Sequence, residues 1–153
     1  MTNNGKGTSS SSPRNILFVC NQNAVRSPVA KALADKHSKR RLFIESGGLI
    51  AGALDPFSVA SMEEVGIDIS DHAPKTLKAI DLSLFDLIVT LTPQSHEQVC
   101  KMLAEARLTE TAVEYWPTPD PSDAEGNRDQ VMDSYRMVRD HLECQIADRF
   151  PFE

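Results

Sequence analysis

The chain has 153 residues, of which 41% are hydrophobic and 25% charged, and this length and composition fit one globular domain. No apolar run is long enough to cross a bilayer, and a net charge of −6 disfavours a nucleic-acid backbone, so the sequence predicts neither kind of partner. Three cysteines leave one unpaired in any disulfide scheme, and with no secretory signal this indicates free thiols in the cytoplasm.

Residues 1–13 are mostly Gly, Ser, Asn and Thr, without any periodic apolar positions. Such a segment buries too little apolar surface to offset the entropy of ordering, so we expect a disordered tail. Residues 14–153 then form a single folded domain.

The first half of this domain predicts two units of a strand followed by a helix. The apolar run 15–19 is typical of a strand buried on both faces, and helical spacing begins at Pro28. A second strand at 42–48 precedes a helix that Pro56 opens and Gly66 ends.

The second half repeats the alternation. Strands are expected at 85–91 and 112–116, and a helix begins at Pro93. After a loop at 117–127 rich in Pro and Asp, a last helix covers about 129–149. This order predicts a single-domain α/β fold, a four-stranded parallel sheet with helices on both faces, which binds ligands at the carboxyl ends of its strands.

One such end carries Cys20 and Arg26, separated by five residues between the first strand and the first helix. Backbone N–H groups in a loop entering a helix form a concavity for anions, and the arginine fork can grip two oxygens of a phosphate. The same positive field favours an ionised sulfur, to which Ser27 can donate a hydrogen bond. We therefore predict a nucleophilic Cys20 and an oxyanion bound by Asn21, Gln22, Asn23, Ala24, Val25 and Ser27.

The competing interpretation makes Cys20 a buried thiol at the end of a strand and Arg26 a surface cation. A bare Cys-x5-Arg pattern arises by chance in many proteins. The apolar strand before it and the Ser-Pro helix start after it favour the anion-binding loop.

Phosphoryl transfer to sulfur also requires a proton for the leaving oxygen, which a carboxylic acid can supply. Asp120 is the first candidate because it follows the fourth predicted strand, although Asp-Pro is also a common turn signal. Asp55 stands before a proline as well, and we interpret it as the cap of the second helix. Asp123 is expected to face solvent and Asp129 to cap the last helix.

The sequence predicts no metal and no cofactor, because its histidines are scattered and lack the spacing of metal ligands. Cations complement the dipole at the end of a helix, so we interpret the one dense basic cluster as a solvated helix end and not as a partner site. This basic cluster consists of Lys36, His37, Lys39, Arg40 and Arg41.

The stretch from Val19 to Pro28 resembles the low-molecular-weight protein tyrosine phosphatase superfamily, which includes the thioredoxin-coupled arsenate reductases. The similarity extends over about residues 15–150, with further matching stretches at 46–48, 66–70, 89–91 and 116–121. The resemblance implies a sheet of order 2-1-3-4 and a phosphatase-like catalytic domain. It assigns Cys20 as nucleophile, Arg26 as oxyanion clamp, Ser27 as thiolate stabiliser, Asp120 as general acid and Asn23 as the brace of the loop.

Four positions depart from the family pattern. Gln22 replaces a usual glycine and is expected to disturb the loop backbone. Val25 replaces a second loop cysteine, so no disulfide can form within the loop. Thr92 stands where the reductases carry a resolving cysteine, and Cys100 lies one residue from the second such position, which on a helix rotates its sulfur by about 100°.

The sequence also lacks the aromatic residues that line the phosphotyrosine slot of many relatives, both in 46–56 and after Pro121. Our first hypothesis is a phosphatase that acts on phosphotyrosine or a similar monoester through a phosphocysteine on Cys20. An arsenate reductase that uses an external thiol or Cys100, and an oxyanion-binding protein without catalysis, are the alternatives. The substrate is then a phosphorylated protein or a small phosphate or arsenate oxyanion, and no pattern indicates an oligomeric state.

Overall fold

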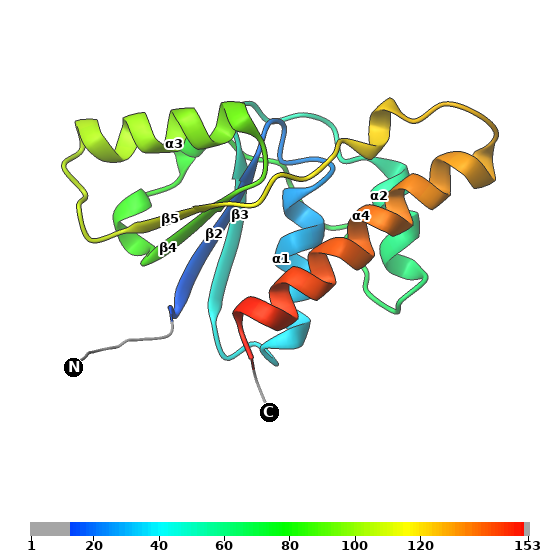
Figure 1. Ribbon diagram of the computed structural model, residues 1–153, viewed down its shortest axis with the longest axis horizontal. Coiled ribbons are helices and arrows are strands. Elements are labelled where there is room, and N and C mark those ends of the chain that lie inside the picture. The colour runs from blue at the N-terminus through cyan, green and yellow to red at the C-terminus, as the bar shows by residue number, and fades with distance from the viewer. Residues whose placement is uncertain (1–12, 152–153) are drawn as a thin grey trace.

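The computed structural model describes residues 13–151, so the predicted disordered tail lies outside the described residues except for Pro13. Four parallel strands form one sheet in the order β3-β2-β4-β5 (Figure 1). This order confirms the predicted 2-1-3-4 arrangement. The strands are β2 (Asn15–Cys20), β3 (Phe43–Gly48), β4 (Leu87–Thr90) and β5 (Ala112–Tyr115).

Helices cover both faces of the sheet, as expected for a parallel arrangement (Figure 1). One side carries α1 (Ser27–His37) and α4 (Arg128–Arg149), with α2 (Pro56–Glu63) packed against α4, and α3 (Pro93–Glu105) covers the other side. Short 3-10 helices are η1 (Leu77–Ala79), η2 (Leu82–Leu84) and η3 (Pro121–Asp123). Between residues 13 and 151, no helix is both long and apolar enough to span a membrane.

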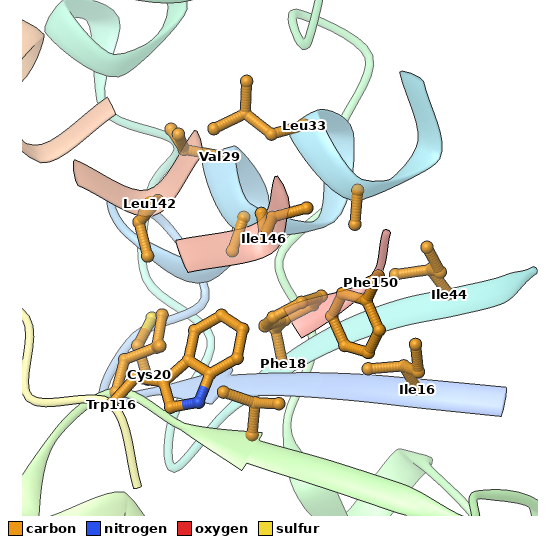
Figure 2. Packing of buried hydrophobic residues seen from close by; sticks show 14 of the residues in the cluster. Ile16, Phe18, Cys20, Val29, Leu33, Ile44, Trp116, Leu142, Ile146 and Phe150 are labelled. Carbon is orange, nitrogen blue, oxygen red and sulfur yellow. The ribbon is translucent and has the colours of Figure 1, made fainter. Parts of the chain in front are cut away.

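The central strand β2 is buried at every residue except its first, and its side chains alternate between two cores. The larger core lies between the sheet and helices α1 and α4, where Phe18 meets Trp116 edge to face with ring centroids 5.9 Å apart (Figure 2). The smaller core joins Leu17 and Val19 to α3. Burial on both faces fixes the register of β2 and therefore the position of Cys20 at its end.

Two details differ from the sequence-based expectations. Strand β4 begins at Leu87, later than predicted, because Phe85 ends η2 with its N–H bonded to the Leu82 carbonyl. Asp129 does not cap α4, so that prediction was wrong. Asn127 is the cap, and its side chain accepts a hydrogen bond from the Gln130 N–H at 2.9 Å.

Candidate active site

The segment from Cys20 to Arg26, called the anion loop below, joins the end of β2 to the start of α1. Cys20 is 1% exposed, and Arg26 occupies the N-cap position of α1, where no side chain caps the helix. The first N–H groups of α1 are therefore not satisfied by a capping side chain, and Ser27 N lies 3.4 Å from the Cys20 sulfur. The helix N-terminus thus points its positive end at the sulfur.

Each of the seven backbone carbonyls of the anion loop accepts a hydrogen bond from a protein donor at 2.9–3.2 Å. Those carbonyls are consequently turned away from the centre of the loop. In chain order, the donors are the N–H groups of Leu49, Ile50 and Gly52, the His72 imidazole, the Asp55 N–H, the Ser58 hydroxyl and the Ala30 N–H.

In a planar trans peptide the N–H points opposite to the C=O, so outward carbonyls direct the following amides inward. The described chain contains no cis peptide bond, and within it none of the amides of residues 21–26 donates to another protein group. These amides therefore surround the space in front of the Cys20 sulfur. Such a ring of N–H groups is a site for an anion.

The space itself is a small cavity of about 70 Å³. This is about twice the ~30 Å³ that one molecule occupies in liquid water, so it suits one tetrahedral oxyanion. The side chains around it belong to Cys20, Asn21, Gln22, Val25, Arg26, Asp120 and Ser122. The other predicted binding residues, Asn23, Ala24 and Ser27, are buried and are not among the residues that line the cavity.

The Cys20 sulfur is held by two groups of Ser27. Its hydroxyl oxygen is 2.9 Å from the sulfur, and its N–H is the donor at 3.4 Å. The hydroxyl oxygen also accepts a hydrogen bond from the Asn23 side-chain amide at 2.9 Å, and its own proton has two neighbouring acceptors, the sulfur at 2.9 Å and the Gly47 carbonyl at 3.4 Å. The N–H and the hydroxyl of Ser27 thus both lie beside the Cys20 sulfur.

Asn23 braces the anion loop from behind. It is fully buried and has a φ of 53°, a left-handed conformation that asparagine tolerates better than most residues. Its side chain donates to Ser27 and to the Ser46 hydroxyl at 2.9 Å and accepts from the Lys75 N–H at 3.0 Å. His72 donates to its carbonyl at 2.9 Å, and burial is the main reason why the pKa of this histidine lies below its usual value.

Arg26 is 7% exposed, and its guanidinium faces the cavity. Its Nη1 donates to the Thr118 carbonyl at 2.9 Å, and its Nη2 lies 3.8 Å from an Asp120 carboxylate oxygen. Its buried Nε finds no acceptor among residues 13–151. A buried donor without a partner costs about 1–3 kcal/mol, and the arginine that carries it is one of the residues that line the cavity.

The two aspartates that precede prolines occupy different surroundings. Asp120 lines the cavity and accepts hydrogen bonds from the N–H and hydroxyl of Ser122 at 2.9 and 2.6 Å. Asp55 caps α2 through the Phe57 N–H, as predicted, and also accepts a hydrogen bond from the Tyr135 hydroxyl at 2.5 Å. The fold therefore brings Asp120, and not Asp55, to the cavity of Cys20.

Gln22 does not introduce a left-handed backbone into the anion loop, where only Asn23 has a positive φ. Room for its side chain comes from Gly52, since a Cβ atom there would lie 2.5 Å from Gln22 Oε1. Gly48 similarly allows the close approach of the loop, because a Cβ atom would lie 2.6 Å from Asn23 N. Two glycines outside the loop thus compensate for the glycine missing within it.

The other two cysteines are far from this site. Cys100 and Cys144 are free and exposed, and neither lines the cavity. Helix α3 begins near the loop, where the Thr92 hydroxyl donates to the Asn21 side chain at 2.7 Å, but Cys100 follows eight residues later, about 12 Å along the helix. No group of three metal-ligating side chains occurs in the described part of the chain.

Several supporting residues escaped the sequence analysis, among them His72, Lys75, Ser58 and Thr118. Each touches the anion loop from a distant part of the chain. No local pattern marks them, because a single histidine, lysine or hydroxyl group is ordinary in any loop. Only the family-like stretches at 46–48, 66–70 and 116–121 point toward this part of the fold.

A sequence model of the low molecular weight phosphotyrosine protein phosphatase family matches residues 15–149. The chain belongs to this family. Among its relatives in this phosphatase family are the arsenate reductases of Bacillus licheniformis and Bacillus subtilis, each 31% identical to it. The matches cover 86% and 87% of this chain and 91% and 92% of those relatives.

Solved structures of the phosphatase family share the fold. An arsenate reductase in the phosphate binding state is 25% identical with a TM-score of 0.71, and the match covers 88% of this chain and 95% of that one. A protein tyrosine phosphatase is 26% identical with a TM-score of 0.69, covering 88% and 91% of the two chains. Both activities therefore occur among proteins of comparable similarity to this chain.

Proposed function

We propose that this chain hydrolyses a phosphate monoester through a phosphocysteine intermediate on Cys20. The observation that carries the proposal is that one cavity of about 70 Å³ combines the nucleophile, the arginine and a carboxyl group. An oxyanion-binding protein without catalysis would need the amides and Arg26 but neither a thiol nor Asp120. We therefore favour an enzyme over the non-catalytic alternative.

The proposed reaction has two steps. The Cys20 thiolate attacks phosphorus while the bond to the leaving oxygen breaks, and Asp120 transfers its proton to that oxygen. In the second step Asp120 accepts a proton from a water molecule, which attacks the phosphocysteine and releases phosphate and the thiolate. The inward amides and Arg26 are fixed before the substrate arrives, so they can stabilise the equatorial oxygens without reorganisation.

Arsenate reduction is the second candidate, and the 31% identity to proteins named arsenate reductase favours it. Cys20 would displace water from arsenate, and a thiol would then attack the Cys20 sulfur, forming a disulfide and releasing arsenite. The separation of Cys100 from the loop argues for an external thiol, such as glutathione, as the electron donor. Both candidates fit a cytoplasmic setting, which we propose for this chain.

The deciding experiment compares two reactions of one preparation: hydrolysis of an aryl phosphate and thiol-dependent reduction of arsenate. We expect hydrolysis without added thiol, and its loss in Cys20→Ser, because serine is not ionised at neutral pH. Phosphate binding, measured by calorimetry, should persist in this variant. Residual hydrolysis within tenfold of wild type would remove Cys20 from the nucleophile role.

Cys100→Ser and Cys144→Ser are the matched controls, since both cysteines are free and outside the cavity. Neither change should alter hydrolysis. Arsenate turnover that exceeds hydrolysis in wild type would favour the reductase. Loss of arsenate turnover in Cys100→Ser would then show that Cys100 serves as the resolving thiol.

A further inference from the structure

A second, larger cleft lies behind the anion loop, between α1 and the segment 66–72. Its volume of about 770 Å³ is within the range of sites for small molecules, about 300–1,000 Å³. It shares no lining residue with the cavity of Cys20. We refer to it as the α1 cleft.

Only some of the charged side chains that line the α1 cleft have an ionic or hydrogen-bonding partner within residues 13–151. Lys31 is paired with Asp35 at 2.9 Å, and the Asp68 carboxylate accepts both hydrogen bonds that Ser70 can donate. Lys39 and Arg40, in contrast, have exposed side chains with no ionic partner among the described residues. One end of the cleft therefore presents unneutralised positive charge in a protein with a net charge of −6.

A third cation belongs to the same end. The Lys36 ammonium group has one contact, the Val65 carbonyl at 3.4 Å, and two further protons to donate. Asp71 is the remaining acidic lining residue, and it precedes His72 at the far end of the lining segment. An anion is therefore best accommodated beside Lys36, Lys39 and Arg40.

The backbone of this basic end is unusual. Lys39 and Arg40 follow α1 with φ angles of 54° and 60°, where glycine is the residue that adopts a left-handed conformation without strain. Both are held there by hydrogen bonds from their N–H groups to the carbonyls of Lys36 and Asp35. These main-chain hydrogen bonds fix the positions from which the Lys39 and Arg40 side chains extend.

The cleft also has apolar lining residues. They are Pro28 and Ala32 of α1 and Ile67 and Ile69 of the segment 66–72. From this combination we propose that the α1 cleft binds an organic phosphate of about nucleotide size, with its phosphate at Lys36, Lys39 and Arg40 and its apolar body over Ala32 and the two isoleucines. The ligand is thus recognised by charge at one end and by apolar contact at the other.

The site is linked to the anion loop through one side chain. His72 lines the α1 cleft and donates to the Asn23 carbonyl at 2.9 Å, on the residue that braces the loop. A ligand that displaces or fixes His72 alters the support of Asn23. Binding in the cleft and oxyanion binding in the loop are therefore coupled, and the coupling is reciprocal.

The test is a titration of the full chain with adenosine 5′-monophosphate, during which NMR spectra record the shifts of the amide resonances. Molybdate, at a concentration that saturates the shifts of residues 20–27, occupies the anion loop and prevents the nucleotide from binding there. We expect shifts at Lys39, Arg40, Ile67 and His72. Adenosine, which lacks the phosphate, should bind at least tenfold more weakly.

The double variant Lys39→Gly/Arg40→Gly removes both cations and relieves the backbone, so it should fold at least as well as wild type. Its affinity for the nucleotide should fall at least tenfold. Arg107→Gly is the matched control, because Arg107 is also an exposed arginine with a left-handed φ of 58° after a helix, but outside the cleft. It should bind the nucleotide like wild type.

Coupling is measured by titrating molybdate into wild type and the double variant with and without the nucleotide. The nucleotide should change the affinity for molybdate by a different factor in the two proteins. In wild type it acts through the α1 cleft and by competition within the anion loop, whereas in the double variant only the competition remains. Absence of nucleotide shifts in the cleft, unchanged affinity in the double variant, or an identical factor in both proteins would each overturn the proposal.

Discussion

The dipeptide Asp-Pro occurs at Asp55 and at Asp120, and the two aspartates share one structural role. In both, one carboxylate oxygen accepts the N–H two residues ahead and caps a helix that starts with the proline. They differ in the second oxygen. In Asp55 it accepts the Tyr135 hydroxyl, whereas in Asp120 it lies 3.8 Å from Arg26 at the cavity.

This difference shows that a local motif sets the conformation of an aspartate but not its function. The second oxygen of Asp55 is used to join α2 to α4. That of Asp120 remains available to a ligand, with its side chain 33% exposed. Four substitutions test whether this separation between a structural and a chemical aspartate is correct.

Asp120→Asn should have the largest effect. If Asp120 is the general acid, turnover of a substrate with a poor leaving group should fall by about 10²–10⁴-fold, because general acid catalysis is typically worth that much. A substrate with an activated phenol needs no proton and should lose far less. Steady-state rates on both substrates give the contrast, and equal losses on the two would show that the acid lies elsewhere.

Arg26→Lys tests the partner that distinguishes Asp120 from Asp55. The lysine keeps the charge but loses the planar fork that contacts Thr118 and faces Asp120. We expect kcat/KM to fall by about 10²–10³-fold, since a preorganised donor is worth about 2.7–4 kcal/mol. A loss below threefold would contradict the clamp assignment.

Tyr135→Phe removes the hydrogen bond that holds Asp55. Because the acceptor is a carboxylate, the free energy of unfolding should fall by about 1.5–3 kcal/mol, as measured by urea denaturation. Activity should stay within threefold of wild type, since Tyr135 does not line the cavity. A loss of activity without a loss of stability would mean that Asp55 belongs to the chemical site after all.

The hydrogen-bonded pair of Tyr135 and Asp55 also makes the free energy of unfolding depend on pH. Burial, followed by the hydrogen bond to Asp55, raises the pKa of Tyr135 above the ordinary tyrosine value of 10.0. The unfolded chain therefore loses this proton first as the pH rises. The difference in the free energy of unfolding between wild type and Tyr135→Phe should be constant below about pH 10 and decrease above it. Urea denaturation of both proteins between pH 8 and 11 measures the difference, and an advantage that grows above pH 10 would contradict the pairing.

Asp55→Asn should have the smallest effect on catalysis. Asparagine is as good an N-cap as aspartate, but its single side-chain oxygen cannot accept from both Phe57 and Tyr135, so the free energy of unfolding should fall by up to about 1.5–3 kcal/mol, the loss expected for Tyr135→Phe. The dependence of rate on the leaving group should match that of wild type. A larger contrast between substrates than in Asp120→Asn would reverse the two assignments.

The sequence predicted the parts of the molecule that depend on neighbouring residues. The apolar run of β2, the spacing of α4 and the Cys20–Arg26 motif are all visible within a few residues. The supports of Asn23 are not, because Ser46, His72 and Lys75 follow it by 23, 49 and 52 positions. Residue type alone also does not locate the N-cap of α4. Asn127 and Asp129 are both good capping residues, and the backbone conformation decides that Asn127 is the cap.

The outward carbonyls of the anion loop make its shape dependent on later parts of the chain. Six of the seven donors belong to residues 49–58 and 72, so a chain ending before Leu49 would contain the whole Cys20–Arg26 motif without the contacts that shape it. Affinity for an oxyanion therefore requires that β3, α2 and the segment around His72 have docked. Phosphate then acts as a ligand of the native state alone, and at a hundred times its Kd it would resist unfolding by about 2.7 kcal/mol.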